Sequence, residues 1–517
     1  MQKLKKWLTW LDQNILTLLV SGYIFIIPLY PKLPLKMINY TYIAVRLEDL
    51  YVALVALVFF IQFIRKKVTL NKKYLLLFGI FWTAVFVSFL YNWLVTKIIV
   101  IQHLGLLHSL RRVEYMFIFF VIGSTIQTKK DVVRYLKLSF VAFALVCIYG
   151  IGQKFLGWPA VQTMNPEYAK GYLLVLDAYA RISSTFAGHY DFAAYLIFLM
   201  PIILGFFIAK QQKKYFALFA LGLVTLILTA SRASYLSYIG SVILFLLYVR
   251  KFKLLIVVIA LTALLTPLSD TLTSRLTRTF QQTQIFVNPD TGEVIVPKDL
   301  KPDELPPGDF GANINAKAIA QNQGKRPVFI DPKLEIETKK AIKEKIIQEA
   351  SKSGKTLTEE EIRALVDQAF GEQIPITKYL IDISLSTRFQ VSWPRAIVAF
   401  SKNILLGTGP SSMGEATDGD YFRWLAEFGL FGTISFLLIL GSIMKEVFVK
   451  AKNMIKKDPF GYVLYGFFFG TIGLFVNASY IDVFEASKVA YTFWLVAGLF
   501  VASLPVLGTK VVNKSKN

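Results

Sequence analysis

The sequence contains about twelve apolar runs that are long enough, or nearly long enough, to cross a lipid bilayer as helices of about 20 residues each. Hydrophobic residues make up 55% of the 517-residue chain, which is too large a share for a soluble protein of this length. The runs lie at about 13–30, 47–64, 74–94, 111–126, 132–156, 190–209, 213–230, 233–249, 253–269, 421–444, 460–478 and 487–507. We therefore predict an all-α polytopic membrane protein with about twelve transmembrane helices.

The basic residues lie in short clusters between the apolar runs. The formal net charge of +23 would suit a nucleic-acid-binding protein, but these positions are typical of cytoplasmic loops in a membrane protein. With twelve spans, these clusters fall on one side: Lys3-Lys5-Lys6, Arg65-Lys66-Lys67, Lys129-Lys130, Lys213-Lys214, Arg250-Lys251-Lys253, Lys456-Lys457 and the C-terminal tail. We expect a multi-pass protein of the cell inner (cytoplasmic) membrane with both termini cytoplasmic, membrane lipids around it and no nucleic-acid partner. The first run lacks a small-residue cleavage site, so we expect it to remain as an uncleaved span.

A long polar segment interrupts the apolar runs and divides the chain into three regions. We expect N-terminal transmembrane helices over 1–269, an external loop subdomain over 270–420, and C-terminal transmembrane helices with a cytoplasmic tail over 421–517. Long loops cross the membrane largely regardless of their charge, so the basic residues of 270–420 are compatible with an external position.

The composition of this external insert predicts mainly helical structure with one small hairpin. Residues 286–296 favour a hairpin that turns at Pro289 to Gly292, and the Pro-rich segment 301–311 favours irregular structure. Residues 333–350 favour a charged helix. Thr358 and Glu361 are spaced as a capping box for a helix that ends near Phe370.

The most informative polar stretch is Asn403–Gly432, which leads into the tenth apolar run. Glycines and a proline predict a turn at Gly407 and Gly409. A polar loop with Asp418 and Asp420 follows, and Glu427 lies about two helical turns further on. Acids beside a membrane helix are costly unless they have a partner or a task. Ordinary helix capping by the aspartates is the structural alternative.

Three arginines are predicted at the outer ends of apolar runs. Arg181 lies in ARISSTFAGHYDF, Arg232 in the tight turn of LTASRASYL, and Arg388 in SLSTRFQVSWPRA. Snorkelling of a single arginine to the interface is the structural alternative for each. Arg232 is the strongest candidate for a functional cation, because small residues flank it in a turn too short for a solvated loop.

Four motifs together resemble the O-antigen ligase and O-antigen polymerase superfamily of bacterial membrane proteins. They are the S-R turn at Arg232, the R-x-S-x-T-F segment at Arg181, the T-R-x-x-x-x-W segment at Arg388, and G-x-G-P followed by L-A-E-x-G-L-x-G around Glu427. The resemblance covers roughly 130–505. In many ligases of this superfamily a His-Asn pair lies nine and eight residues before the glutamate, where this chain has Asp418 and Gly419.

The resemblance implies a metal-independent, inverting glycosyltransferase that needs no cofactor. Its donor would be a polyprenyl-pyrophosphate-linked glycan, and its acceptor a hydroxyl of another glycan or lipid at the outer membrane face. The pyrophosphate would be bound by three arginines, Arg181, Arg232 and Arg388, since guanidinium groups bind phosphate in a bidentate fork. Asp418 or Asp420 would act as the catalytic base, and Glu427 would pair with an arginine or orient that base.

Weaker candidates lie elsewhere at the predicted outer ends of the helices. His189 and Asp191 follow Arg181 in the same segment, and capping is an equal interpretation for Asp191. The acidic residues Glu48 and Asp49 follow Arg46, and mutual ion pairing is favoured over a metal site. With three histidines and the single cysteine Cys147, the chain offers few soft metal ligands and no disulfide.

A lipid-linked oligosaccharide flippase is the alternative function. A flippase would need polar groups along a path through the membrane, whereas the polar motifs here collect at one face. The sequence does not separate ligase from polymerase, because both use the same class of donor. It also leaves open the sugar, the acceptor and the role of residues 280–375.

Overall fold

The computed structural model divides into two compact units, which we describe separately: residues 1–273 with 395–517, and residues 274–394. It describes residues 2–41, 43–163, 167–177, 179–277, 280–288, 294–295, 332–352, 357–381, 388–414 and 417–507. The predicted irregular segment 301–311 and the predicted turn at Pro289 to Gly292 lie outside these residues.

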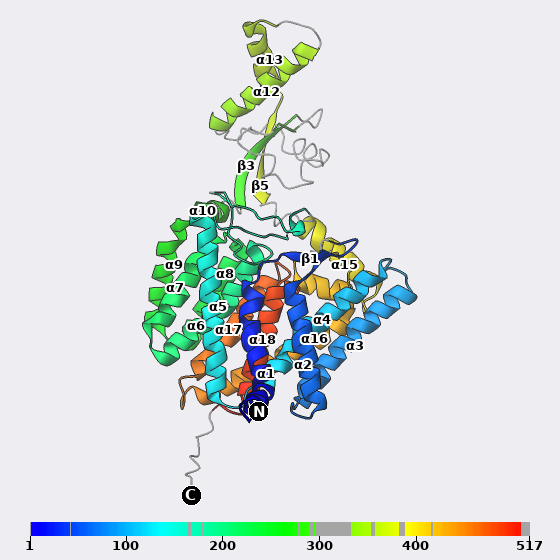
Figure 1. Cartoon of the computed structure of the whole chain (residues 1–517). Coiled ribbons are helices and arrows are strands. Elements are labelled where there is room, and N and C mark those ends of the chain that lie inside the picture. The colour runs from blue at the N-terminus through cyan, green and yellow to red at the C-terminus, as the bar shows by residue number, and fades with distance from the viewer. Residues whose placement is uncertain are drawn as a thin grey trace. The chain divides into compact units, whose positions relative to one another are not determined.

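The first unit is a bundle of helices joined mostly by short loops (Figure 1). Its long helices are α1 (Gln2–Leu29), α2 (Leu47–Ile64), α3 (Lys72–Leu94), α4 (Gln102–Gly123), α5 (Lys129–Phe155), α6 (His189–Lys210), α7 (Lys213–Leu228), α8 (Arg232–Tyr248), α9 (Phe252–Leu265), α16 (Asp420–Met454), α17 (Gly461–Ala478) and α18 (Ser487–Ser503). The shorter elements are β1 (Pro34–Met37), β2 (Ala44–Arg46), η1 (Tyr168–Lys170) and η2 (Thr266–Leu268). Helices α10 (Asp270–Thr277) and α15 (Trp393–Lys402) each cross a boundary between the units.

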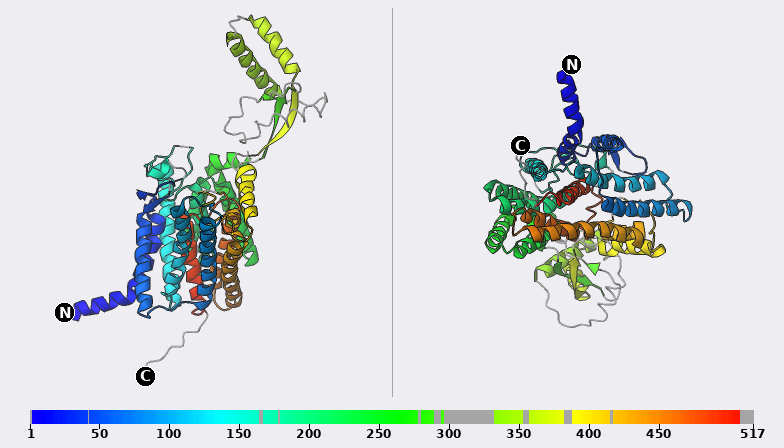
Figure 2. Two further views of the ribbon diagram at one scale, coloured as in Figure 1. Left: turned by 90° about the vertical axis from the view of Figure 1, so that its right-hand side faces the viewer. Right: turned by 90° about the horizontal axis from the view of Figure 1, so that it is seen from below.

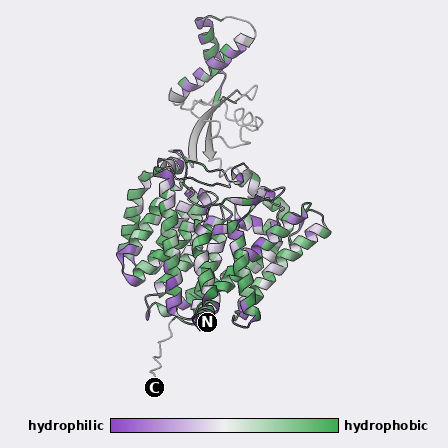
Figure 3. Cartoon of the chain, viewed as in Figure 1, coloured by the Kyte–Doolittle hydropathy of each residue, from purple (hydrophilic) through white to green (hydrophobic). Residues whose placement is uncertain are grey.

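The helices confirm an all-α protein with several potential membrane spans. Among the described residues seven helices, α1, α2, α3, α5, α6, α16 and α17, are long and apolar enough to cross a membrane. Each of the twelve predicted runs coincides with a helix, but the remaining five helices are shorter or carry more charge. The expected total of twelve spans therefore stays a prediction. Most of the ribbon of these helices has the colour of hydrophobic residues, and hydrophilic residues are more frequent toward the helix ends (Figure 3).

The centre of the bundle is α6, which is buried along nearly its whole length. It packs against α17 through glycines of α17 that bring the two backbones close together. A Cβ atom on Gly466 would lie 2.4 Å from the carbonyl oxygen of Pro201, and one on Gly470 would lie 2.4 Å from that of Phe198. Small residues commonly allow such close approach between membrane helices. Around this pair, α18 packs against α4, and α16 packs against α3 and α17.

Helix α16 is broken at Gly429, whose backbone has φ 60° and ψ −161°. The turn segment 404–409 runs beside the break. Its backbone forms hydrogen bonds with the C=O and N–H groups of α16 that lose their helical partners at the break. Thr408 N–H donates to Ala426 C=O at 2.8 Å and Gly409 N–H to Glu427 C=O at 3.0 Å, while Leu430 N–H donates to Ile404 C=O at 2.8 Å. Unsatisfied backbone groups are expensive in a membrane, so this pairing is what allows the break.

The hydrogen bonds between the turn segment and α16 need glycine at both positions of the predicted turn. Gly407 and Gly409 both have positive φ, 67° and 92°. A Cβ atom on Gly407 would lie 2.5 Å from the carbonyl oxygen of Ala426, so only glycine fits against α16 there. These residues thus shape the support of α16, whose first turns carry Asp420 and Glu427.

The bundle has two chemically different ends. At one end lie the described residues of the segments 30–46, 95–101, 156–188, 403–419 and 479–486, and at the other lie the short loops 65–71, 124–128, 211–212, 249–251 and 455–460 (Figure 1). We name these the loop end and the basic end, because the predicted clusters of Lys and Arg flank the short loops. The first turns of α1 extend away from the bundle in both views of Figure 2, and their side chains are exposed.

The second unit combines a small antiparallel sheet with two helices. The strands β3 (Phe280–Val287), β4 (Val294–Ile295) and β5 (Ile374–Ile381) pair in the order β4-β3-β5. The helices α12 (Pro332–Lys352) and α13 (Glu359–Gly371) pack against each other. The predicted hairpin and charged helix are thereby confirmed in the described residues.

The predicted capping box of α13 is confirmed as well. Thr358 Oγ1 accepts from the backbone N–H of Glu361, and the Glu361 carboxylate accepts from the backbone N–H of Thr358 at 2.8 Å. This hydrogen bonding lowers the pKa of Glu361 below its usual value. The ring of Phe370 packs on Phe286 of β3 with centroids 5.4 Å apart, so helix and sheet share a core.

Candidate functional site

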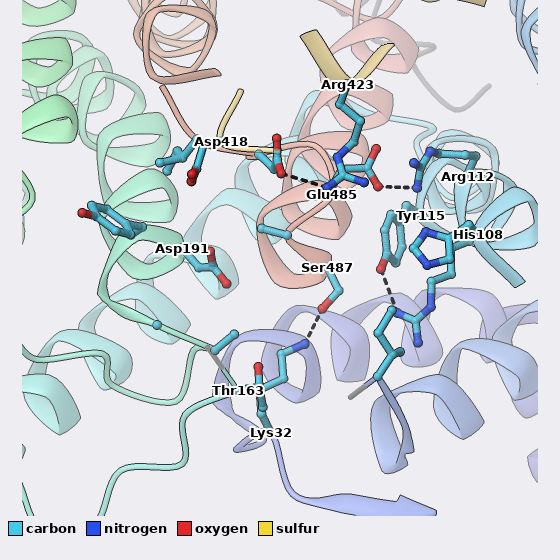
Figure 4. Close-up of a pocket in the computed structure, with 18 of the residues that line it drawn as sticks. Lys32, His108, Arg112, Tyr115, Thr163, Asp191, Asp418, Arg423, Glu485 and Ser487 are labelled. Atoms are coloured by element: carbon cyan, nitrogen blue, oxygen red, sulfur yellow. Dashed lines mark hydrogen bonds and ion pairs between the residues drawn. The ribbon is translucent and has the colours of Figure 1, made fainter. Parts of the chain in front are cut away.

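A polar cavity of about 380 Å³ opens at the loop end of the bundle (Figure 4). Five separate parts of the sequence line it: the segment before α2, α4, the segment before α6 with the first turn of α6, the segment before α16 with the first turn of α16, and the 479–486 loop with the start of α18. Its cationic side chains are Lys32, Arg46, Arg111, Arg112 and Arg423, and its carboxylates are Asp191, Asp418, Asp482 and Glu485. With five cations against four carboxylates, the lining has a positive excess of one charge, which favours an anionic ligand.

Buried ion pairs hold two of the cavity arginines, Arg423 and Arg112, in place on one wall. Arg423 in the first turn of α16 contacts Glu427 at 3.1 Å, one helical turn further along, and Asp482 at 3.1 Å. Arg112 of α4 contacts the same Glu427 at 3.3 Å and also pairs with Glu485. Glu427 is completely buried, and its carboxylate therefore joins α4 to α16 and holds both guanidinium groups in place.

The loop between α17 and α18 is tied to the start of α16 by two aspartates. Asp482 accepts the backbone N–H groups of Thr417 and Gly419 at 2.8 and 3.0 Å. Burial raises the pKa of Asp482, but the Arg423 guanidinium and these backbone donors outweigh it and hold the pKa below its usual value. Asp482 is therefore ionised at neutral pH, and its charge offsets that of Arg423.

Asp420 forms the reciprocal tie from α16 to the same loop. Its Oδ2 accepts the backbone N–H groups of Val483 and Phe484 at 2.7 and 3.1 Å. The side chain is completely buried and does not line the cavity. Asp420 therefore acts here as a structural acceptor, and the sequence could not separate this role from that of Asp418 two residues away.

Two buried lysines, Lys32 and Lys488, connect the segment after α1 to the start of α18 at the loop end. Lys32 pairs with Glu48 at 2.6 Å and hydrogen-bonds Ser487. Burial, opposed by the Glu48 carboxylate, lowers the pKa of Lys32 below its usual value. Lys488, at the start of α18, donates to the backbone carbonyls of Pro28, Tyr30 and Thr185 at 3.1, 2.6 and 2.7 Å. Glu48 is thus a partner of Lys32, and the Asp49 carboxylate accepts the Arg46 backbone N–H at 2.8 Å.

Of the predicted catalytic and secondary acids, Asp418 and Asp191 line the cavity. Figure 4 shows them on one side of it, with Arg112, Tyr115 and His108 on the other. Asp418 has a positive φ of 58°, a conformation that aspartate tolerates better than most residues. Glu427 does not line the cavity but supports two arginines that do, in agreement with its expected pairing role.

The three predicted pyrophosphate arginines are not brought into this cavity. Arg181 contacts His189 Nε2 at 2.7 Å and lies over the ring of Tyr190, with 5.9 Å between the guanidinium carbon and the ring centroid. Tyr190 lines the cavity, so Arg181 and His189 stand directly behind its wall. Arg232 is buried at the start of α8 and is absent from the residues that line the cavity, as far as the chain is described. Arg388 is buried in the second unit.

The residues that sequence reasoning missed are mostly on α4. The apolar run was expected to begin at 111, but the helix begins at Gln102 and carries His108, Arg111 and Arg112 inside the bundle. A pair of adjacent arginines within an apolar helix was the available signal, since such charges are rare there and mark function. Asp482 and Glu485, in a short loop between two apolar helices, gave a second signal.

Comparisons with known proteins add no relative to this picture. No protein-family model matches the chain, and no curated protein matches it. Within the described residues, no group of three or more His, Cys, Asp or Glu side chains is arranged to hold a metal ion. The chemistry of the cavity itself is therefore the basis on which a function can be assigned.

Proposed function

We propose that the protein is a membrane glycosyltransferase that uses a polyprenyl-pyrophosphate-linked glycan as its donor. The observation that supports this most is the cavity with five cationic side chains at the end of the helix bundle opposite its basic loops. A pyrophosphate between an apolar membrane and water requires cations at that depth, and guanidinium groups bind phosphate oxygens in a bidentate fork. By the positive-inside rule the basic loops face the cytoplasm, so the cavity faces outward.

The reaction is a single displacement at the anomeric carbon of the donor. The acceptor hydroxyl oxygen forms a bond to C1, and the bond between C1 and the phosphate oxygen breaks. Its electron pair leaves with the polyprenyl pyrophosphate, whose growing charge the cavity cations stabilise. The hydroxyl proton passes to a carboxylate, for which Asp418 is our first candidate and Asp191 the second, because both line the cavity. This displacement inverts the anomeric centre.

The remaining predicted acids support the site without touching the reacting atoms. Asp420 holds the 479–486 loop, and Glu427 holds Arg112 and Arg423. The resemblance assigns the pyrophosphate to Arg181, Arg232 and Arg388, whereas the cavity offers a different set of cations. Metal-independent chemistry remains part of the proposal, with these cations in the role that a divalent ion has in other transferases.

The same distribution of charge favours an enzyme over a flippase. A flippase exposes polar groups along a path that connects the two membrane faces. Most of the charged residues that line this cavity come from the loop end or from the first turn of a helix that starts there, and Arg111 and Arg112 lie about midway along α4. None of the charged lining residues comes from the basic end. A reaction at one surface uses such an arrangement better than passage across the membrane does.

Purified protein incubated with lipid-pyrophosphate glycans from the source cell tests the proposal. We expect transfer that persists in EDTA, with ladders on gels for a polymerase and a single transfer to a foreign acceptor for a ligase. Asp418→Asn should lower the rate by about 10²–10⁴, the usual range for loss of a general base. Asp418→His should keep partial activity with a pH optimum moved toward about 6.5.

A matched control is Asp458→Asn at the basic end, where Asp458 pairs with Lys129. It should keep the wild-type rate. Full activity of Asp418→Asn together with loss in Asp191→Asn would move the base to Asp191. Activity that disappears in EDTA and returns with Mg²⁺ would contradict the metal-independent mechanism.

A further inference from the structure

An apolar groove of about 630 Å³ lies between α1 and α2, near the polar cavity. Side chains of the last turns of α1 and the first turns of α2 line it: Phe25, Ile26, Leu29, Leu47, Leu50 and Leu54. Leu47, Leu50 and Leu54 are each about half exposed, at 46%, 54% and 46%. In a membrane such a groove is open to hydrocarbon chains.

The groove and the cavity are lined by consecutive residues at two places in the chain. Pro31 lines the groove, and the next residue, Lys32, lines the cavity. Arg46 lines the cavity, and the next residue, Leu47, lines the groove. Neighbouring Cα atoms are only about 3.8 Å apart, so a ligand with an anionic head and an apolar tail can occupy both at once.

Two cations that line the cavity, Arg46 at this junction and Arg111 on α4, are buried without an ion-pair partner among the described residues. Arg46 is 6% exposed and Arg111 is 8% exposed. Arg111 donates to the hydroxyl of Tyr115 at 2.9 Å, but neither guanidinium forms an ion pair with a carboxylate among the described residues. The Nε atoms of all four cavity arginines, Arg46, Arg111, Arg112 and Arg423, lack a hydrogen-bond partner there, so the two pairs differ in their carboxylate contacts. By contrast, Arg112 and Arg423 each contact two carboxylates.

Two acids that influence Arg111 accept hydrogen bonds from other groups. Asp49 and Glu114 act on Arg111 electrostatically. However, Asp49 accepts the backbone N–H of Arg46, and Glu114 accepts the Tyr491 hydroxyl at 2.5 Å. A buried cation without a directly paired anion is costly, and a bound phosphate would compensate it.

We infer that Arg46 and Arg111 bind the pyrophosphate of the lipid donor, and that the α1–α2 groove holds the first isoprene units of its tail. This rests on the proposed function and names its donor subsite. It assigns the phosphate to residues other than Arg181, Arg232 and Arg388. An ordinary phospholipid tail is the competing occupant of the groove, and the experiment separates the two.

Binding to the purified protein in detergent is measured for three probes: undecaprenyl pyrophosphate, inorganic pyrophosphate and phosphatidylglycerol. Arg46→Gln and Arg111→Gln should each weaken both pyrophosphates at least about tenfold, whereas Arg250→Gln, an exposed arginine at the basic end, should not. Leu50→Trp should weaken undecaprenyl pyrophosphate about tenfold and leave inorganic pyrophosphate unchanged. Leu57→Trp, exposed on α2 but outside the groove, is its control.

The melting temperature of each variant shows whether it is folded, and Arg46→Lys and Arg111→Lys replace any Gln variant that is not. These keep the charge but lose the fork, so they should bind pyrophosphate more weakly than the wild type. The inference is overturned if folded Arg46 and Arg111 variants bind as the wild type does. It is also overturned if phosphatidylglycerol competes equally with undecaprenyl pyrophosphate, which would mark an ordinary lipid groove.

The binding readout also separates this inference from the proposed function. Binding as expected without any glycosyl transfer would remove the function and keep the subsite. Transfer that depends on Arg181 and Arg232 but is unchanged in folded Arg46 and Arg111 variants would remove the subsite and keep the function.

Discussion

At the residue scale, the cavity is organised by one buried carboxylate. The Glu427 carboxylate forms ion pairs with the guanidinium groups of two arginines from different helices, Arg112 of α4 and Arg423 of α16. The sequence allowed its pairing with an arginine to be predicted, because an acid two turns into an apolar helix needs a partner. It did not identify Arg112, since that partner lies far away in the sequence and only the packing of α4 on α16 brings it close.

We predict that Glu427→Gln strongly destabilises the protein. The substitution leaves two buried guanidinium groups with one fewer counter-charge each, and breaking a buried pair typically costs about 3–5 kcal/mol. Thermal unfolding in detergent measures this. The control is Glu446→Gln on the same helix, where Glu446 pairs with half-exposed Lys73 at 2.6 Å and an exposed pair is worth about 1 kcal/mol or less. Equal melting temperatures for the two variants would contradict the role given to Glu427.

At the scale of elements, α16 is two helical segments joined at Gly429 and supported by the 404–409 segment. The glycine signals of this stretch were visible in the sequence, and a turn at Gly407 and Gly409 was predicted from them. The break at Gly429 was not, because it depends on a backbone segment that arrives from outside the helix. The break matters for the site, because the segment of α16 before it carries Arg423, which lines the cavity.

We predict opposite effects for two glycine substitutions on α16. Gly429→Ala should destabilise the protein and disturb the cavity, because φ is 60° and the new Cβ would lie 2.5 Å from the Leu405 carbonyl. Gly441→Ala meets no atom within 4 Å and should be neutral or stabilising by about 0.5–1 kcal/mol. Melting temperatures compare the variants. A Gly429→Ala protein as stable as Gly441→Ala would show that the break is not needed.

At the scale of the whole molecule, composition and charge pattern predicted an all-α membrane protein because these properties add up over many residues. The cavity could not be predicted in this way. Its lining is assembled from five separated parts of the chain, and the resemblance directed attention to Arg232 and Arg388 instead of to α4. Asp418 and Asp191 were found because a polar loop and a helix start each bring a carboxylate to the loop end.

The orientation of the bundle gives a prediction at this scale. The test places single cysteines in a Cys147→Ala background, at Lys66, Lys214, Lys457 or Tyr40. An impermeant thiol reagent is then added to intact cells whose outer barriers are permeabilised. Only the Tyr40 site, which is exposed at the loop end, should be labelled, because basic loops stay in the cytoplasm. Labelling at Lys214 but not at Tyr40 would reverse the orientation and place the cavity inside.

The measurement that tests the central claim most directly uses a donor with two labels, ³²P in its pyrophosphate and ³H in its glycan. The protein is reconstituted in vesicles with this donor and an acceptor. A glycosyltransferase should move ³H to the acceptor while ³²P stays with the polyprenyl lipid, and Asp418→Asn should slow this separation about 10²–10⁴-fold. Both labels crossing the membrane together on an intact donor, with no separation of ³H from ³²P, would contradict the account and identify a flippase.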